Sequence, residues 1–580
     1  MNWTSLVPAL DWARTYNTGF FRKDFLAGLT VAIMLIPQGM AYALLAGLPP
    51  IYGLYASIVP LVLYLGFGSS RQLSVGPVAI VSLLVLASLS EMAAPQSPEF
   101  ISLAITAALM AGLIQVVLGS LRLGFLIEFL SHPVLVGFTA AAALIIGFSQ
   151  VKFLFGISLE RVSQLHVILI ELFGKVSDMH ALTAAVGFGS LLLMILIRKL
   201  SKRIPSALAA VVVATLVVWA FRLDELGVQV VGSVPKGLPS FLVPDLSLST
   251  MEQLLPLALT ICLISFIESL AIAKNIQKRD KSYRIVPNQE LLALGISKIA
   301  GSFFQAFPTT GSFTRSAINF FSGAKTGVSS LIAAGVVALS LLFLTPLFYF
   351  IPNAVLGAIV VMAVAGLIEF KEIRDLWRFD RKDFLSLLTT FLVTLFVGVQ
   401  EGVLTGVILS LGFIIYRSSY PHVAILGRLP GSTDFRNLTR FPEATTWDDI
   451  LIMRFDAQLY FGNAKQFQDI IEDLIGEKGS SLKYIILDGT SITDVDSTGF
   501  HMLHDLIDDM RRNDIELHFA GCPGPVRDLI YKTGTFDRLG DGRMHFNVND
   551  AIGYIKEGRA ISDQLAEEIS SSNYRNSDKN

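Results

Sequence analysis

The sequence predicts a polytopic α-helical membrane protein of about 14 spans, followed by a small cytoplasmic α/β domain. Three observations predict this fold class. The 580 residues have a mean hydropathy of +0.60. Only 16% of them are charged, whereas soluble proteins carry about a quarter. After Arg417 the long apolar runs end, and short strand and helix patterns begin.

Apolar runs occupy most of the chain before Arg417. A helix needs about 20 mostly apolar residues to cross the hydrocarbon core of a bilayer. By this rule we expect spans near 25–46, 51–67, 76–90, 99–120, 125–147, 181–198, 206–221, 253–274, 288–305, 312–322, 326–347, 351–369, 383–400 and 401–417. Several of these runs are too short to cross alone.

Basic residues orient the spans. Lys and Arg gather at Arg22 and Lys23 and in the loops near 198–203, 274–284 and 371–382. Because cytoplasmic loops are enriched in Lys and Arg, this pattern predicts an even number of spans with both termini in the cytoplasm. The first twenty residues show no cleavable signal peptide. With no targeting segment visible, we expect a bacterial inner (plasma) membrane.

The predicted domains follow from these patterns. They are a cytoplasmic N-terminal segment at 1–24, a transmembrane domain at 25–420, a linker at 421–444, an α/β domain at 445–560 and a disordered tail at 561–580.

Within the α/β domain, strands are expected at 450–455, 484–487 and 515–520. Asn463 and Ser497 are expected to cap the two helices that follow them, and Asn549 precedes a last amphipathic helix.

Several kinds of chemistry are not predicted. Cys262 and Cys522 form no metal or disulfide pattern with each other, so no metal site and no cofactor are expected. The formal net charge of −2 and the lack of a basic stripe argue against a nucleic-acid partner. The C-terminal domain shows no nucleophile–base pair and no phosphate-binding glycine loop. The chain is therefore not expected to be an enzyme.

Two short apolar spans begin with Gly and Pro. One follows Ser-Val-Gly-Pro-Val-Ala at 74–79, and the other begins in Pro-Thr-Thr-Gly-Ser-Phe-Thr-Arg-Ser at 308–316. A pair of interrupted spans indicates the binding site of a transporter. The first N–H groups of a helix that starts inside the membrane have no intrahelical partner, and the helix dipole is positive there. We therefore expect the two helix starts to face each other and to bind an anion.

Two charged residues lie within or next to these spans. Arg315 lies one turn after the second helix start, where it would strengthen the attraction of an anion. Its alternative role is a structural pair with a carboxylate. Glu268 lies inside the span near 253–274 and is expected to couple transport to protons, because a desolvated carboxylate can exchange a proton near neutral pH. Its alternative role is a fixed partner of Arg315 or a helix cap.

The first span contains two further candidates. Gln38 follows Pro37, whose ring opens the helical hydrogen-bond ladder, so its amide can donate to an oxyanion. Tyr42 lies one turn later on the same side. A helix–helix contact for Gln38 and a packing role for Tyr42 are the alternatives.

These segments resemble a known family. The runs IPQGMAYALLAGLPPIYGLYAS, GSSRQLSVGPVAIVSLL and NQELLALGISKIAGSFFQAFPTTGSFTRSAIN resemble the SulP family of anion permeases, and IILDGTSITDVDSTG resembles its C-terminal STAS domain. The resemblance implies two inverted seven-span repeats, arranged as a core and a gate domain, and a homodimer in the lipid bilayer.

The resemblance also implies a set of site residues. It implies a small inorganic anion bound between the third and tenth spans, with Gln38 and Tyr42 from the first span, Arg315 as the basic residue and Glu268 as the carboxylate of proton-coupled members. The residues at the two span starts are Val78, Ala79, Gly311, Ser312, Phe313 and Thr314. Ile272, four residues after Glu268, argues against a sodium site.

The STAS resemblance implies that Ser497 can be a regulatory phosphorylation site, whereas its local pattern favours a helix cap. A regulatory protein that binds the STAS domain is a further expected partner.

The function expected first is proton–sulfate symport by a secondary active transporter. The alternatives are a bicarbonate, chloride or dicarboxylate transporter or exchanger, and an uncoupled anion channel. A nucleobase transporter is less favoured, because Arg315 is present and no second carboxylate lies near Ser312.

Overall fold

The computed structural model describes residues 7–125, 131–158, 164–200 and 205–557. The chain divides into two compact units, Met1–Ser410 and Leu411–Asn580, which are described separately below. The predicted tail at 561–580 and part of the basic cluster at 198–203 lie outside the described residues.

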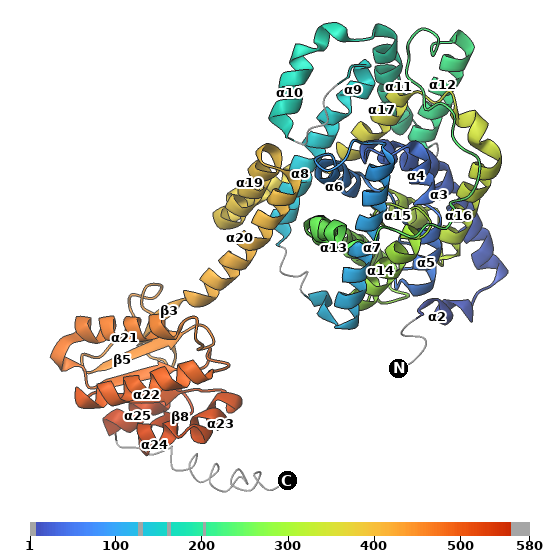
Figure 1. Cartoon of the computed structure of the whole chain (residues 1–580). Helices are drawn as coiled ribbons and strands as arrows, with labels where there is room; N and C mark the ends of the chain where they lie inside the picture. Colours follow the sequence, from blue (N-terminus) through green and yellow to red (C-terminus); the bar gives the residue numbers. More distant parts are fainter. Residues whose placement is uncertain (1–6, 126–130, 159–163, 201–204, 558–580) are drawn as a thin grey trace. The chain divides into compact units, whose positions relative to one another are not determined.

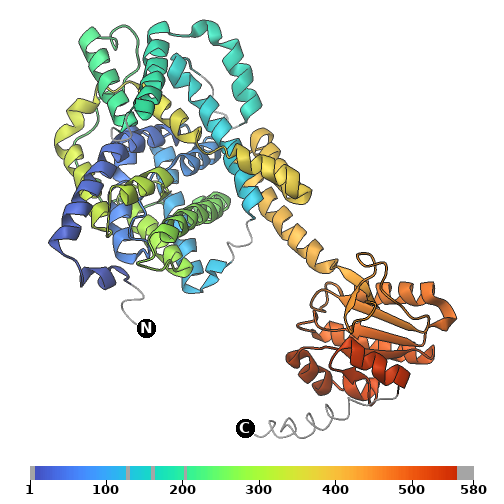
Figure 2. The same cartoon turned by 180° about the vertical axis from the view of Figure 1, so that it is seen from behind.

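Helices make up most of the first unit (Figures 1 and 2). They are α2 (Ala9–Ala13), α3 (Thr18–Leu45), α4 (Pro50–Tyr55), α5 (Val59–Phe67), α6 (Ala79–Leu89), α7 (Pro98–Ser120), α8 (His132–Ser149), α9 (Val151–Phe155), α10 (Leu165–Gly174), α11 (Ala181–Leu200), α12 (Ser206–Phe221), α13 (Leu248–Arg279), α14 (Pro287–Ser302), α15 (Phe313–Phe321), α16 (Val328–Leu339), α17 (Asn353–Val364), α18 (Phe370–Phe379) and α19 (Arg381–Phe396). The last helix, α20 (Val399–Ser419), continues into the second unit.

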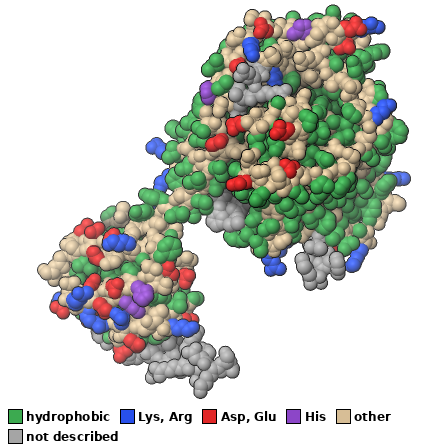
Figure 3. Space-filling model, in the orientation of Figure 1, with side chains coloured by type: hydrophobic (Ala, Val, Ile, Leu, Met, Phe, Trp, Pro, Cys, Tyr) green, Lys and Arg blue, Asp and Glu red, His purple; other side chains and the backbone are tan. Residues whose placement is uncertain are grey.

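Among the described residues, 8 helical segments are long and apolar enough to cross a membrane. Four shorter apolar helices, α6, α10, α12 and α17, add to them. The predicted run at 51–67 corresponds to one of these 8 segments, Pro50–Phe67, in which residues 56–58 separate α4 from α5. The apolar helix α10 was not among the predicted spans. Large apolar side chains are exposed on α11 and α12, for example Leu192 and Trp219. Hydrophobic side chains cover much of this unit in Figure 3, as expected for a surface in contact with lipid.

Glycines allow the helices to cross closely. A Cβ atom added to Gly112 of α7 would lie 2.8 Å from the carbonyl oxygen of Gly295 in α14. A Cβ added to Gly295 would lie 2.7 Å from the carbonyl oxygen of Gly112. Only glycine fits at both positions, which is typical of packed membrane helices.

Two very short strands interrupt the helical unit. Strand β1 (Val75–Gly76) pairs with β2 (Thr310–Gly311) in an antiparallel manner. Each strand is followed within a few residues by a short helix, α6 after β1 and α15 after β2. The two helix starts that the sequence predicts at 74–79 and 308–316 are therefore neighbours.

The second unit contains a six-stranded sheet in the order β4-β3-β5-β6-β7-β8. The strands are β3 (Val423–Arg428), β4 (Phe435–Asn437), β5 (Ile450–Phe455), β6 (Tyr484–Asp488), β7 (Glu516–Ala520) and β8 (Met544–His545). Strand β3 is antiparallel to β4 and to β5, and the pairs from β5 to β8 are parallel.

Helices cover both faces of this sheet. The helices are α21 (Ala464–Lys478), α22 (Ser497–Arg512), α23 (Gly524–Lys532), α24 (Thr535–Leu539) and α25 (Val548–Glu557). Leu451 and Met453 of β5 share a buried cluster with α21 and α22, whereas Ile450 and Ile452 share another with α25. This alternation follows from the two-residue period of a strand, and it gives the unit two hydrophobic layers.

The structure differs from the predictions at several points in this unit. Residues 421–444, predicted as a linker, contain β3 and β4 of the same sheet. The cap of α22 is Asp496, whose Oδ1 accepts a hydrogen bond from the N–H of Gly499 at 2.8 Å, and Ser497 is the first helical residue. Asn549 lies inside α25, and the side chain of Asn547 accepts from the N–H of Asp550 at 3.0 Å instead.

Asn463 lies at the predicted N-cap position of α21, but its side chain does not cap the helix. Its Oδ1 accepts from the N–H of Tyr460 at 3.0 Å, and its Nδ2 donates to the carbonyl of Gln458 at 2.8 Å. The amide therefore stabilises the loop before the helix.

Candidate functional site

The two short helices α6 and α15 begin at one crossing of the chain. Val75 is paired with Gly311, and Gly76 with Thr310. Ser312, the N-cap of α15, accepts a hydrogen bond from the N–H of Arg315. Val78, the N-cap of α6, makes no side-chain cap, so the first N–H groups of α6 have no such partner. Both helix starts bring positive potential to this crossing.

Hydrogen bonds fix the crossing across the two chain segments. The N–H of Ser312 donates to the carbonyl of Ser74 at 2.9 Å, and the N–H of Ser74 donates to Oγ of Ser316 at 2.9 Å. These bonds hold the two helix starts in one register, which preorganises a site built from both.

Helix α13 is hydrogen-bonded to this crossing. Oγ of Ser269 accepts from the N–H of Gly311 at 2.9 Å and lies 3.0 Å from Oγ1 of Thr310. Thr310 in turn donates to the carbonyl of Ser265 at 2.8 Å. The helix that carries Glu268 is thus bonded directly to the strand before α15.

Arg315 extends from α15 to the other helix start. Its side chain is fully buried, and its Nη1 donates to the carbonyl of Pro77 at 3.0 Å. A Cβ added to Gly76 would lie 3.1 Å from Nη2 of Arg315, so glycine leaves room for the guanidinium. Its Nε and Nη2 are buried without any hydrogen-bond partner. Unsatisfied charged donors are costly in a protein interior, and an anion would satisfy them.

Arg315 interacts electrostatically with Glu268 and with Tyr42, so both side chains lie near its guanidinium group. Oε2 of Glu268 is buried without a hydrogen-bond partner, so this oxygen is not fixed by a direct bond to Arg315. Oε1 of Gln38, one turn before Tyr42 on α3, is likewise buried and unpaired. Helix α3 continues through Pro37 without ending.

The remaining predicted residues occupy the two helix starts. Val78, Ala79, Gly311 and Ser312 are buried, whereas Phe313 and Thr314 are exposed at the start of α15. The structure therefore gathers the helix starts, Arg315, Glu268 and Tyr42 into one region of the first unit.

Two buried charges were missed by the sequence reasoning, although both lie in the predicted span at 288–305. Glu290 of α14 accepts hydrogen bonds from Tyr64 at 2.6 Å and from the hydroxyl of Ser69 at 2.6 Å, so it has a structural role. Nζ of Lys298 donates to Oε1 of Gln115 at 2.9 Å. The presence of charged residues inside an apolar run is a signal that could have identified them.

The amide of Gln115 links Lys298 to α13. Its Nε2 donates to Oγ of Ser265 and to the carbonyl of Cys262, both at 3.0 Å. Because the carbonyl of Ser265 accepts from Thr310, a chain of contacts runs from Lys298 to the crossing.

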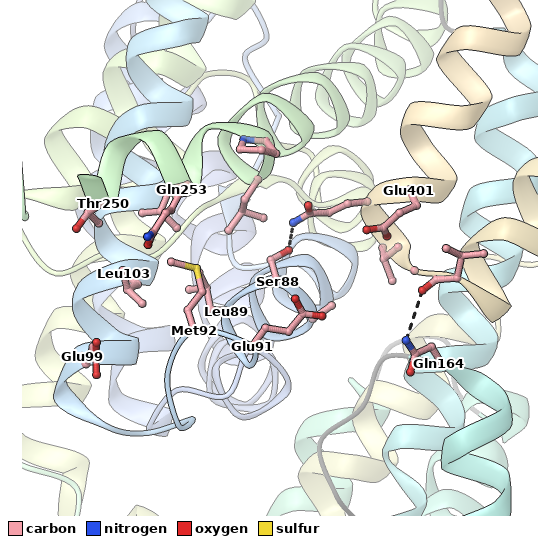
Figure 4. Close-up of a pocket in the computed structure, with 18 residues that line it drawn as sticks. Ser88, Leu89, Glu91, Met92, Glu99, Leu103, Gln164, Thr250, Gln253 and Glu401 are labelled. Carbon is pink, nitrogen blue, oxygen red and sulfur yellow. Dashed lines mark hydrogen bonds between the residues drawn. The ribbon is translucent and has the colours of Figure 1, made fainter. Parts of the chain in front are cut away.

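A cavity of about 580 Å³ lies at the opposite end of α6. Figure 4 shows the carboxylates of Glu91, Glu99 and Glu401 at this cavity, where Gln400 donates to Ser88. Helix α6 has 11 residues, so its ends are about 15 Å apart. None of the predicted anion-binding residues lines this acidic cavity.

Comparisons with known proteins agree on one family. The model of the sulfate permease family matches residues 21–390, and the model of the STAS domain matches residues 441–551. The chain is 41% identical over 568 residues to sulfate transporter 4.1, chloroplastic, of Arabidopsis thaliana, covering 94% of this chain and 82% of the relative. It is 39% identical to the probable sulfate transporter 4.2 of the same plant, covering 94% and 83%.

A solved structure shares the fold. The murine Solute Carrier 26 family member A9 anion transporter, in an inward-facing state, superposes with a TM-score of 0.88. The two chains are 25% identical, and the match covers 95% of this chain and 94% of the other. The predicted fold class, a membrane part of many apolar helices with a C-terminal STAS domain, is confirmed.

The predicted bacterial inner membrane is wrong. The relatives named above are plant proteins, and one of them is chloroplastic. The prediction was based on the lack of a visible targeting segment, and such an absence does not identify the membrane.

Proposed function

Because the chain belongs to the sulfate permease family, we propose that it is a secondary active transporter that carries sulfate across a membrane together with protons. The observation that supports an anion site is Arg315. Its Nε and Nη2 are buried and unpaired beside the starts of α6 and α15. Sulfate offers several acceptor oxygens to such donors, and its two charges match the positive potential of the helix starts.

The proposed substrate is sulfate because relatives that share 41% and 39% of the sequence are named sulfate transporters. In this proposal the first N–H groups of α6 and α15 bind the anion, and Arg315 donates its free guanidinium N–H groups. Gln38 and Tyr42 supply further polar contacts from α3. The membrane environment strengthens each of these interactions, because few water molecules screen them.

Proton coupling is proposed for Glu268. An ionised Glu268 lowers the positive potential that Arg315 presents to the anion, because the two side chains interact electrostatically. Protonation removes this negative charge, so proton binding favours sulfate binding. By linkage, sulfate binding favours proton binding to the same extent. The unpaired Oε2 of Glu268 leaves the carboxylate free to accept the proton.

An uncoupled anion exchanger or channel is the second candidate. It is favoured by the structural similarity to the murine Solute Carrier 26 family member A9, which is an anion transporter. The same helix starts and Arg315 would bind the anion, and Glu268 would then have no role in transport.

The homodimer, the cytoplasmic position of both termini, a regulatory protein at the STAS domain and phosphorylation of Ser497 stay predictions. The exposure of Ser497 at the start of α22 is compatible with its modification.

Uptake of labelled sulfate into proteoliposomes tests the proposal. We expect accumulation above equilibrium when the external pH is lower than the internal pH, and only slow equilibration without the gradient. Bicarbonate, chloride and fumarate serve as competitors. Uptake that equilibrates equally with and without the gradient would favour the uncoupled candidate, and uptake of a competitor alone would replace sulfate as the substrate.

Glu268→Gln separates coupling from binding. We expect this variant to lose gradient-driven accumulation but to keep exchange of internal for external sulfate. Glu252→Gln is the matched control, because Glu252 is an exposed carboxylate on the same helix. If Glu268→Gln accumulates sulfate with the same pH dependence as the natural protein, Glu268 is not the coupling residue.

A further inference from the structure

One large apolar side chain of the α/β domain is far more exposed than the others. Phe461, in the loop between β5 and α21, is 75% exposed. Among the described residues after Tyr420, the other exposed large hydrophobic side chains are Phe441, at 36%, and Phe546, at 46%. Single exposed apolar residues are common on protein surfaces, so exposure alone indicates no partner. The contacts around Phe461 show where its ring lies.

The loop that carries Phe461 is firmly held. Leu459 forms an isolated bridge with Val495, and the N–H of Phe461 donates to Oδ2 of Asp496 at 2.9 Å. The side chain of Asn463 bonds to the backbone of the same loop, as described above. Phe461 is therefore exposed in an ordered loop, so little conformational entropy is lost when its ring contacts a partner.

The same loop is bonded to the last turn of α20. The hydroxyl of Tyr460 donates to Oγ of Ser418 at 2.7 Å, and Nδ2 of Asn463 donates to the carbonyl of Ser418 at 3.3 Å. The ring of Phe461 packs edge-on against that of Tyr460, with 5.3 Å between the ring centroids. Residues 411–419 of α20 belong to the second unit, so all these contacts lie within one compact unit. Phe461 therefore lies beside the end of α20.

The end of α20 has the features of a membrane–water interface. Helix α20 has 21 residues and is long and apolar enough to cross a membrane. A helix of this length spans about 31 Å, close to the thickness of about 30 Å of the hydrocarbon core. Arg417 lies in its last turn, and the exposed rings of Tyr416 and Tyr420 are 4.9 Å apart. Because tyrosine and basic residues gather at the ends of membrane spans, we expect the end of α20 at the level of the lipid headgroups.

We propose that Phe461 inserts its ring into the boundary between the headgroups and the acyl chains of the bilayer that α20 crosses. The loop is bonded to the end of the span, so its ring is held at this depth. Aromatic rings are favoured there, because they bury apolar surface next to a polar layer. The contact anchors the α/β domain to the membrane surface beside its own span. It requires only that α20 crosses the bilayer, and it is independent of the anion that is transported.

A bilayer fits this surface better than a second copy of the chain does. A stable protein interface buries about 800 Å² on each partner, whereas an aromatic side chain offers about 150–250 Å². Gln458 and Lys465, on the two sides of Phe461 in the sequence, are exposed and polar, so the apolar surface does not extend along the loop. One isolated ring is sufficient for a contact with lipid.

Quenching of a fluorophore by nitroxide lipids tests the proposal. The full chain with Phe461→Cys is labelled with bimane and placed in phosphatidylcholine nanodiscs. Some of the lipids carry a nitroxide on the headgroup, and iodide in the buffer reports contact with water. We expect the lipid nitroxide to cause a large loss of fluorescence at position 461 and iodide to cause little. Cys262 and Cys522 are buried, and the natural chain gives their background labelling.

Two further labelled positions calibrate the result. Lys483→Cys is the matched control, because Lys483 is exposed just before β6. Strands β5 and β6 are parallel, so Lys483 lies at the opposite edge of the sheet from the loop after β5. We expect iodide alone to quench the label there. Tyr420→Cys marks the end of α20, and the lipid nitroxide should quench it as it quenches position 461.

Three outcomes would overturn the proposal. Quenching at position 461 by iodide alone, as at position 483, would show that the ring faces water. Protection of position 461 from both quenchers would show that protein covers it, for example a second copy of the chain. Equal quenching by the lipid nitroxide at positions 461 and 483 would show that the loop makes no specific contact. Because all three side chains are exposed, normal thermal unfolding of the variants is expected and excludes misfolding as the cause.

Discussion

At the scale of single residues, Arg315 determines what the first unit can bind. A buried guanidinium with only one hydrogen-bonded N–H group is unfavourable in an isolated protein. This cost is relieved when an anion binds, because the anion accepts hydrogen bonds from the buried donors. Anion binding is therefore more favourable than it would be at a site whose donors are already paired. The reasoning does not extend to Oε1 of Gln38, which also has no partner, because this oxygen is an acceptor and an anion offers it no donor.

Replacement of Arg315 should therefore affect binding more than folding. We expect Arg315→Gln to lower the initial rate of sulfate uptake at low sulfate by about 10–100-fold, equivalent to roughly 1.4–3 kcal/mol. Arg315→Lys should recover part of it, because the charge remains but the fork is lost. Uptake kinetics in proteoliposomes measure this effect. Arg381→Gln, at an exposed site at the start of α19, should have normal uptake, and an equal loss in both variants would contradict the prediction.

The N-cap of α22 gives a second prediction at the scale of single residues. Asp496 accepts from the N–H of Gly499 and, through Oδ2, from the N–H of Phe461 at 2.9 Å. Asp496→Ala should destabilise the second unit by about 1–2 kcal/mol. Ser497→Ala should change the free energy of unfolding by no more than about 0.5 kcal/mol. Denaturant unfolding followed by amide hydrogen exchange in α22 measures both, and the reverse order of the two effects would make Ser497 the cap.

At the scale of helices and strands, features that depend on local sequence could be predicted. Gly76, Pro77 and Gly311 are visible in the sequence just before α6 and α15, so the starts of these two short helices were predicted well. Strands β3 and β4 were not predicted. Strand β4 has only three residues and is stabilised by its pairing with β3. The contacts of Lys298 also join distant segments, and no local pattern predicts its bond to Gln115.

The close crossing of α7 and α14 gives a prediction at this scale. Gly112→Ala would bring a methyl group to 2.8 Å from the carbonyl oxygen of Gly295. The helices must then separate, and we expect a loss of stability of about 1–3 kcal/mol. Thermal unfolding of the purified protein in detergent measures the loss. Gly189→Ala in α11 is the control, because its added Cβ has no heavy atom within 4 Å and alanine favours the helix. Equal melting temperatures of Gly112→Ala and the natural protein would show that the crossing tolerates a side chain.

At the scale of the whole molecule, the chain combines two units with different stabilising environments. The first unit exposes apolar helix faces that a bilayer covers, whereas the second has two closed hydrophobic layers and a charged surface (Figure 3). Their unfolding should not be one cooperative transition, because each unit has its own core. Conditions that act on only one core should therefore separate the two transitions.

Acid is such a condition for the second unit, because it contains a buried pair of histidines. Nδ1 of His518 and Nε2 of His545 are 3.0 Å apart. Burial, with the neighbouring His545 and Arg543, lowers the pKa of His518 to about 3, and burial lowers that of His545 to about 4. Both histidines are neutral in the folded protein at neutral pH, whereas an unfolded histidine is half protonated near pH 6.5. The unfolded state therefore binds more protons as the pH falls below about 6.5.

We expect the free energy of unfolding of the second unit to be constant above about pH 7 and to fall between about pH 6.5 and 4, by up to roughly 1.4 kcal/mol per pH unit for each histidine. Amide hydrogen exchange in β6 and β7 of the full chain, corrected for intrinsic rates, measures this slope. His518→Phe should reduce the slope by about one proton, whereas His501→Gln, at an exposed site on α22, should leave it unchanged. A slope that does not change in His518→Phe would show that other groups cause the acid sensitivity. A parallel loss of protection in α7 and α14 would show that the two units unfold together.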